Sequence, residues 1–113
     1  MNQVPTARPQ ILRRAVQLLA LVALVSLPAA HADEYSDVGQ LLRTGKMAEA
    51  LARADQHLAS KPRDPQMRFL KGVIQTESGK PTDAIATFLK LTEDYPELPE
   101  PYNNLAVLYA GQS

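Results

Sequence analysis

The chain of 113 residues contains no cysteine and no tryptophan, and its phenylalanines and tyrosines total six. The absence of cysteine excludes disulfides, thiolate metal sites and a cysteine nucleophile. It also excludes the lipid-bearing cysteine at which a mature bacterial lipoprotein begins. With so few aromatic residues, any core must consist largely of alanine and leucine, as is common where helices pack on helices.

The formal net charge of zero conceals an asymmetry along the chain. Residues 1–32 contain three arginines and no acid, whereas residues 33–113 contain nine basic and twelve acidic residues, a net charge of −3. Phosphate recognition needs clustered cations. Because the second part has no such cluster, we expect no nucleic-acid partner.

The first 32 residues follow the pattern of a secretory signal peptide. Three arginines precede or begin an apolar run over residues 15–27, Pro28 interrupts it, and Ala30-His31-Ala32 matches the small-x-small cleavage rule. We therefore predict cleavage after Ala32, with the folded domain over residues 33–113.

A membrane span is a poorer explanation of the same run. Thirteen helical residues extend about 20 Å, and the hydrocarbon core of a bilayer is about 30 Å thick. An uncleaved short anchor, a mitochondrial presequence and, from Arg13-Arg14, twin-arginine rather than general secretion stay open as alternatives. We expect a periplasmic or secreted protein that meets the membrane only transiently, through its signal peptide.

Residues of the same kind recur 34 positions apart. The pairs are Tyr35 and Phe69, Gly45 and Gly79, Ala50 and Ala84, Leu51 and Ile85, and Pro62 and Pro96. A period of 34 in a helix-turn-helix pattern is typical of tetratricopeptide repeats. Residues 79–96 read G-x4-A-x3-F-x7-P, and residues 102–109 read aromatic-x2-Leu-Ala-x2-Tyr, against the family's W-x2-L-G-x2-Y.

Over about residues 35–113 the chain thus resembles the tetratricopeptide repeat (TPR) family, in its exported bacterial form. The resemblance implies an all-α fold, an α-solenoid of antiparallel helix hairpins with about two and a half repeats. We expect helices near 35–43, 47–60, 65–77, 81–94 and 100–111. Gly45 and Gly79 would end helices in a left-handed conformation. Asp64 would cap a helix that Pro65 begins, and Pro81 would begin the next hairpin partner.

Two helices depart from the pattern. In the helix near 65–77 three polar residues fall at positions that normally pack inward: Arg68, Lys71 and Gln75. We expect this helix to be rotated so that Leu70 and Ile74 face the core, with the Arg and Lys stems lying along the surface. No second helix follows the last one, so we expect three of its residues to be partly uncovered and to allow self-association: Leu105, Leu108 and Tyr109.

The family resemblance also implies a concave groove lined by the first helix of each repeat. On this chain the implied partner-binding residues are Tyr35, Leu42, Phe69, Val73, Thr76, Asn103, Asn104 and Val107. An alternative is that Phe69 and Val73 are simply core residues. The Lys and Asn with which some members clamp a peptide carboxylate are replaced here by other residues.

The sequence offers no pattern of catalytic, cofactor-binding or metal-binding residues. His57, the only histidine after residue 32, is expected to face solvent or the edge of the groove. We therefore expect a protein-interaction module or scaffold, not an enzyme, which binds a peptide or partner protein. The alternative is an N-terminal docking domain of a longer cell-envelope enzyme, acting on the cell wall, whose catalytic part lies outside this chain.

Overall fold

The computed structural model describes residues 33–112, and the predicted signal peptide lies outside this range. Within it the chain forms five α-helices and no strand, which confirms the all-α prediction. They are α2 (Glu34–Arg43), α3 (Met47–Ser60), α4 (Pro65–Glu77), α5 (Pro81–Asp94) and α6 (Glu100–Gln112). Each predicted helix end agrees with the structure to within one residue. None of these helices is long and apolar enough to cross a membrane.

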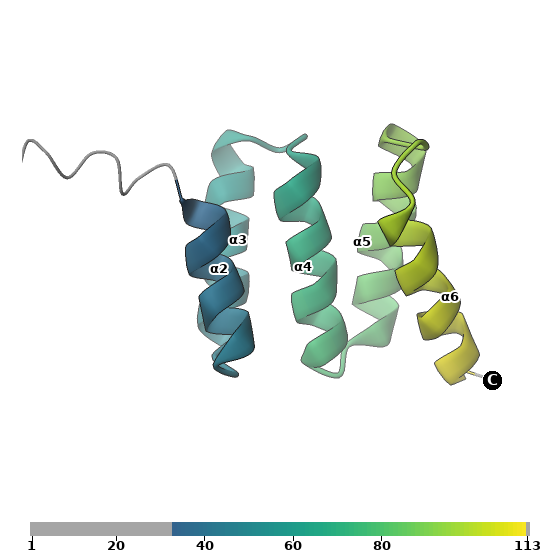
Figure 1. Ribbon diagram of the computed structural model, residues 1–113, viewed down its shortest axis with the longest axis horizontal. Coiled ribbons are helices and arrows are strands. Elements are labelled where there is room, and N and C mark those ends of the chain that lie inside the picture. The colour runs from purple at the N-terminus through teal and green to yellow at the C-terminus, as the bar shows by residue number, and fades with distance from the viewer. Residues whose placement is uncertain (1–32, 113) are drawn as a thin grey trace, which may run out of the picture. The chain divides into compact units, whose positions relative to one another are not determined.

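The helices form two layers. In Figure 1 α2, α4 and α6 lie in front, and α3 and α5 lie behind them. Each helix packs against the next one along the chain, and α2 also packs against α4. Short turns connect the helices, so that neighbours in sequence run antiparallel.

The backbone itself repeats with the 34-residue period. Gly45 and Gly79 have φ values of 78° and 72°, the left-handed region that suits glycine. The amide of Lys46 donates to Leu41 O at 2.8 Å, and that of Lys80 donates to Gln75 O at 2.9 Å. Both α3 and α5 contain 14 residues and begin directly after these lysines. The predicted left-handed helix ends are therefore confirmed.

The start of α4 is fixed by side-chain capping. The Asp64 Oδ1 atom accepts hydrogen bonds from the amides of Gln66 at 3.1 Å and Met67 at 3.4 Å. These amides have no partner within the helix, so the carboxylate satisfies them. Pro65 occupies the first turn, where its missing N–H costs nothing. The predicted cap is confirmed, and Pro81 begins α5 as expected.

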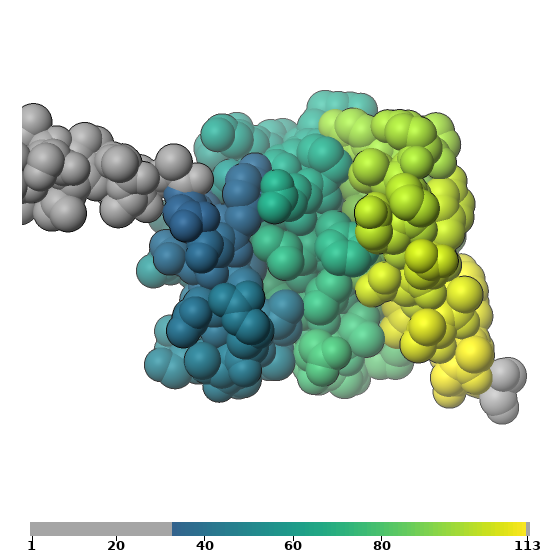
Figure 2. Space-filling model, in the orientation of Figure 1, coloured from purple at the N-terminus to yellow at the C-terminus, as the bar shows by residue number. Residues whose placement is uncertain are grey.

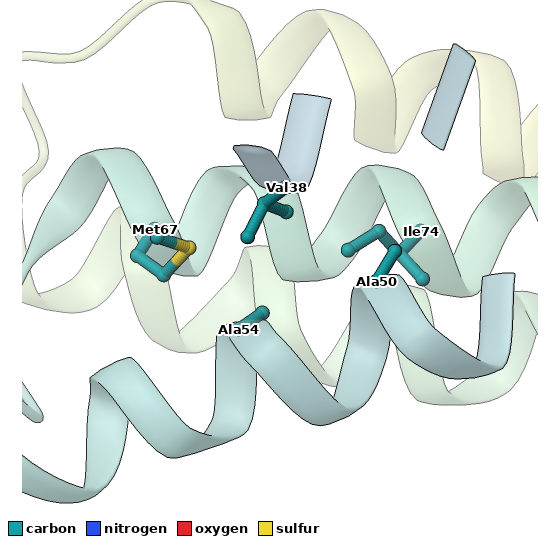
Figure 3. Packing of buried hydrophobic residues seen from close by; sticks show 5 residues of the cluster. All are labelled: Val38, Ala50, Ala54, Met67 and Ile74. Atoms are coloured by element: carbon teal, nitrogen blue, oxygen red, sulfur yellow. The ribbon is translucent and has the colours of Figure 1, made fainter. Parts of the chain in front are cut away.

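One core cluster lies between α2, α3 and α4. Its five buried side chains converge on the space between these helices (Figure 3): Val38, Ala50, Ala54, Met67 and Ile74. The alanines of α3 have no exposed surface, because their small side chains let the neighbouring helices approach closely. Ile74 faces this core as predicted, and Leu70 is partly buried against it.

The polar residues of α4 do not simply lie along the surface. The Arg68 side chain is only 11% exposed and binds Asp94 at 2.9 Å. Lys71 reaches Asp55 on α3 at 2.8 Å. Gln75 is buried, and its Oε1 atom accepts a hydrogen bond from the Thr87 hydroxyl at 2.6 Å. The expectation of free surface stems is thus wrong for Arg68, because α5 supplies a carboxylate beside it.

A second core cluster joins α4, α5 and α6. Its buried members are Ala84, Phe88, Leu105 and Leu108. The ring centroids of Phe69 and Phe88 are 5.6 Å apart, with the rings tilted. Gly72 on α4 makes room for this packing, since a Cβ atom there would lie 2.5 Å from the Phe88 ring.

The last helix is covered differently from the prediction. Leu105 and Leu108 are only 6% and 7% exposed, because both pack into the second cluster. The exposed apolar residues of α6 are instead Tyr102, Val107 and Tyr109, at 46%, 72% and 48%. The expectation of partly uncovered leucines is therefore wrong, and any self-association through α6 would involve these three residues.

Candidate functional site

All eight residues of the implied groove lie on α2, α4 or α6, the helices that form the face shown in Figure 2. Tyr35 and Leu42 are partly buried against the first core cluster. Phe69 and Val73 are partly buried against the second. These four side chains therefore contribute to packing while each keeps part of its surface exposed.

The other groove residues differ in how available they are. The Thr76 hydroxyl donates to the Gly72 carbonyl within α4 at 2.9 Å. Asn103 and Val107 are exposed on α6, and Asn104 is half-buried. Within residues 33–112 neither asparagine side chain has a hydrogen-bond partner, so α6 offers both amides to a ligand.

Only Phe69 among the eight lines a distinct hollow. This hollow, of about 390 Å³, lies between the beginnings of α4 and α6. It is mostly apolar and is lined by Pro65, Gln66, Phe69, Leu98, Glu100 and Pro101. The sequence did not indicate Leu98 or Pro101, because the segment before α6 lies outside the helix pattern from which groove residues were inferred.

His57 does not face solvent or a groove edge, and that expectation is wrong. The residue is only 8% exposed. Its Nδ1 atom lies 2.5 Å from the Glu34 carboxylate, and its Nε2 atom lies 2.6 Å from the Asp64 carboxylate. Helices α2 and α3 and the cap of α4 therefore meet at one imidazole ring.

Tyr35 completes this polar cluster. Its hydroxyl donates to the same Asp64 Oδ2 atom at 2.5 Å, and its ring centroid is 5.5 Å from that of His57. Asp64 thus uses one oxygen to cap α4 and the other to accept from Tyr35 and His57. All buried side-chain polar atoms of the described residues have partners.

The pKa values of the cluster follow from these bonds. The hydrogen bond with Glu34 raises the pKa of His57, and Asp64 adds to this effect against the opposing effect of burial. Burial acts to raise the pKa of Asp64, but the hydrogen bonds from Tyr35 and His57 outweigh it and lower that pKa. The Tyr35 pKa is raised, mainly by its bond to Asp64. The arrangement favours a doubly protonated imidazole between two carboxylates.

The 34-residue period could have revealed the burial of His57. The residue 34 positions later is Leu91, which has no exposed surface. Likewise Tyr35 corresponds to Phe69, and Asp64 to Leu98. The first half of the domain therefore holds a polar cluster where the second half is apolar.

Neither a metal centre nor a known relative identifies the site. Within residues 33–112 no group of three or more His, Asp or Glu side chains is arranged to hold a metal ion. Comparison of the chain with protein-family models, curated proteins and solved structures finds no match. Its function must therefore be inferred from its own residues.

Proposed function

We propose that this chain is an exported protein-interaction module of the tetratricopeptide type, which binds a peptide or partner protein across the face of α2, α4 and α6. The observation that carries this proposal is the repeated backbone. Two left-handed glycines 34 residues apart, with matching turn hydrogen bonds, connect helices that alternate between two layers. Repeats stacked in this way present an extended surface for binding.

The chemistry of this face suits an extended peptide. Partly buried apolar side chains from both halves, such as Leu42 and Phe69, offer contact area. The amides of Asn103 and Asn104 can donate to and accept from a peptide backbone. Val107, 72% exposed, would lose that exposure to water on binding. Function by binding, without catalysis, agrees with the structural use of His57 and its two carboxylates.

Selection from a phage-displayed library of random peptides tests this function. We expect the purified chain to enrich related peptides, and we expect Asn103→Arg or Val107→Arg to weaken their binding at least about tenfold. Ala52→Arg, at an exposed position of α3 in the other layer, is the matched control and should leave binding unchanged. Failure to enrich any peptide, or loss of binding only with Ala52→Arg, would refute the proposal.

A further inference from the structure

The apolar hollow between α4 and α6 has a counterpart in the first half that is closed by polar bonds. There Tyr35 and Asp64 are joined through the Tyr35 hydroxyl. Their equivalents 34 residues later are Phe69 and Leu98, which cannot form such a bond and instead line the hollow. The second half thus has an open apolar site where the first half is latched. In Figure 2 the segment leading into α6 lies beside the beginning of α4.

The rim of this hollow is negatively charged. After Lys90 the sequence contains no Lys or Arg, but it contains four acids. Asp94 is paired with Arg68 and Lys90, and Glu93 with Lys90. The other two, Glu97 and Glu100, have no ion-pair partner among residues 33–112. Glu100 lines the hollow and Glu97 directly precedes Leu98.

Anionic ligands are disfavoured here even though two helices begin at the hollow. The first amides of α4 are already used by the Asp64 cap. In the first turn of α6, Pro101 has no N–H, and Glu100 repels negative charge. A cation near Glu97 and Glu100 would instead be attracted, because opposite charges at an interface steer and orient a partner.

We propose that this hollow binds a peptide segment in which one large apolar side chain adjoins Lys or Arg residues. The apolar side chain enters the hollow against Phe69 and Leu98, and the basic residues lie over Glu97 and Glu100. A volume of about 390 Å³ falls within the range of about 300–1,000 Å³ that is typical of ligand pockets. The inference rests on the proposed interaction function and names the partner's chemistry at one site.

A labelled synthetic peptide, Gly-Ser-Phe-Lys-Lys-Ser-Gly, provides the test by fluorescence anisotropy at low ionic strength. We expect saturable binding that weakens at least about tenfold when Phe is replaced by Ala, when Lys-Lys is replaced by Glu-Glu, or when the protein carries Leu98→Asn or Glu100→Lys. Two matched controls should bind normally. Leu89→Asn changes an exposed leucine of α5, and Glu49→Lys changes an exposed acid in the first turn of α3.

Circular dichroism and unfolding midpoints identify variants that bind poorly because they are unfolded. The proposal is overturned if the Phe-Lys-Lys peptide does not bind, if the Glu-Glu peptide binds as well, or if folded Leu98→Asn and Glu100→Lys bind like their controls. Library-selected peptides that are sensitive to Val107→Arg but not to Leu98→Asn would retain the interaction function and reject this hollow.

Discussion

His57 connects three segments of the chain through one ring, so its charge controls how well they are held. A protonated imidazole donates to both Glu34 and Asp64, whereas a neutral one can donate to only one of them. The raised pKa of His57 means that the folded state binds this proton more tightly than the unfolded state does. The resulting stability is present below the unfolded-state pKa of about 6.5 and is lost as pH rises through the folded-state pKa.

Urea denaturation at a series of pH values should show this dependence. We expect the free energy of unfolding to fall by about 1 kcal/mol on the alkaline side of the His57 titration, the size of one hydrogen bond. Asp64, with its lowered pKa, contributes stability that is lost in acid, as pH falls through its folded-state pKa. The His57→Gln variant should lose the alkaline decrease and keep the acid one. An unchanged alkaline decrease in that variant would assign it to another group.

Gly72 is a second residue whose role is fixed by tertiary contact. A Cβ atom at this position would lie 2.5 Å from the Phe88 ring, which is buried and cannot move away freely. We expect Gly72→Ala to lower the free energy of unfolding by about 1–3 kcal/mol, the usual cost of overpacking.

Gly111→Ala is the matched control, because nothing lies within 4 Å of its would-be Cβ atom. Chemical denaturation should show this variant unchanged or stabilised by up to about 1 kcal/mol, as alanine favours helix. Equal stability of the two variants would mean that Phe88 does not pack against Gly72.

At the scale of single residues, the sequence predicted what is local and missed what is tertiary. The Asp64 cap and the two left-handed glycines follow from their neighbours in the chain. The burial of His57 does not, because its partners Glu34 and Asp64 lie 23 and 7 residues away and come from other helices. Only its relation to Leu91 through the repeat carried a signal.

At the scale of elements, the two alanines of the repeat mark close helix packing. Ala50 and Ala84 each have no exposed surface and lie in the first and second core clusters. Ala84→Leu should therefore lower the free energy of unfolding by about 1–3 kcal/mol. Ala86→Leu, at an exposed position of the same helix, should have almost no effect. Thermal melts of both variants measure the difference, and an unchanged midpoint for Ala84→Leu would place that residue away from the helix contact.

The helix bounds were predictable because proline, glycine and capping residues occur at almost every turn. The pairing of side chains between helices was harder to predict. On α4, Arg68 and Gln75 appeared to be polar residues at inward positions, and their partners Asp94 and Thr87 lie on α5. On α6, Leu105 and Leu108 were buried by α5 without a further helix. Apolar periodicity identifies the buried side of a helix but not the partner that covers each residue.

At the scale of the whole molecule, export remains a prediction from residues 1–32. We expect expression in a bacterial host to yield a mature protein that begins at Asp33, after removal of the apolar run. Intact-mass measurement of the periplasmic fraction checks this expectation, and Ala32→Arg should block processing. A cytoplasmic species that retains residues 1–32, with none processed, would contradict the assignment of a signal peptide.

The central claim is that partners bind across α2, α4 and α6. Its most direct test is an NMR titration of the isotope-labelled protein with a library-selected peptide. We predict that amide shifts change at residues of this face, including Phe69, Asn103 and Val107, with little change at exposed positions of the other layer such as Ala52 and Ala86. Changes confined to α3 and α5 would contradict the claim.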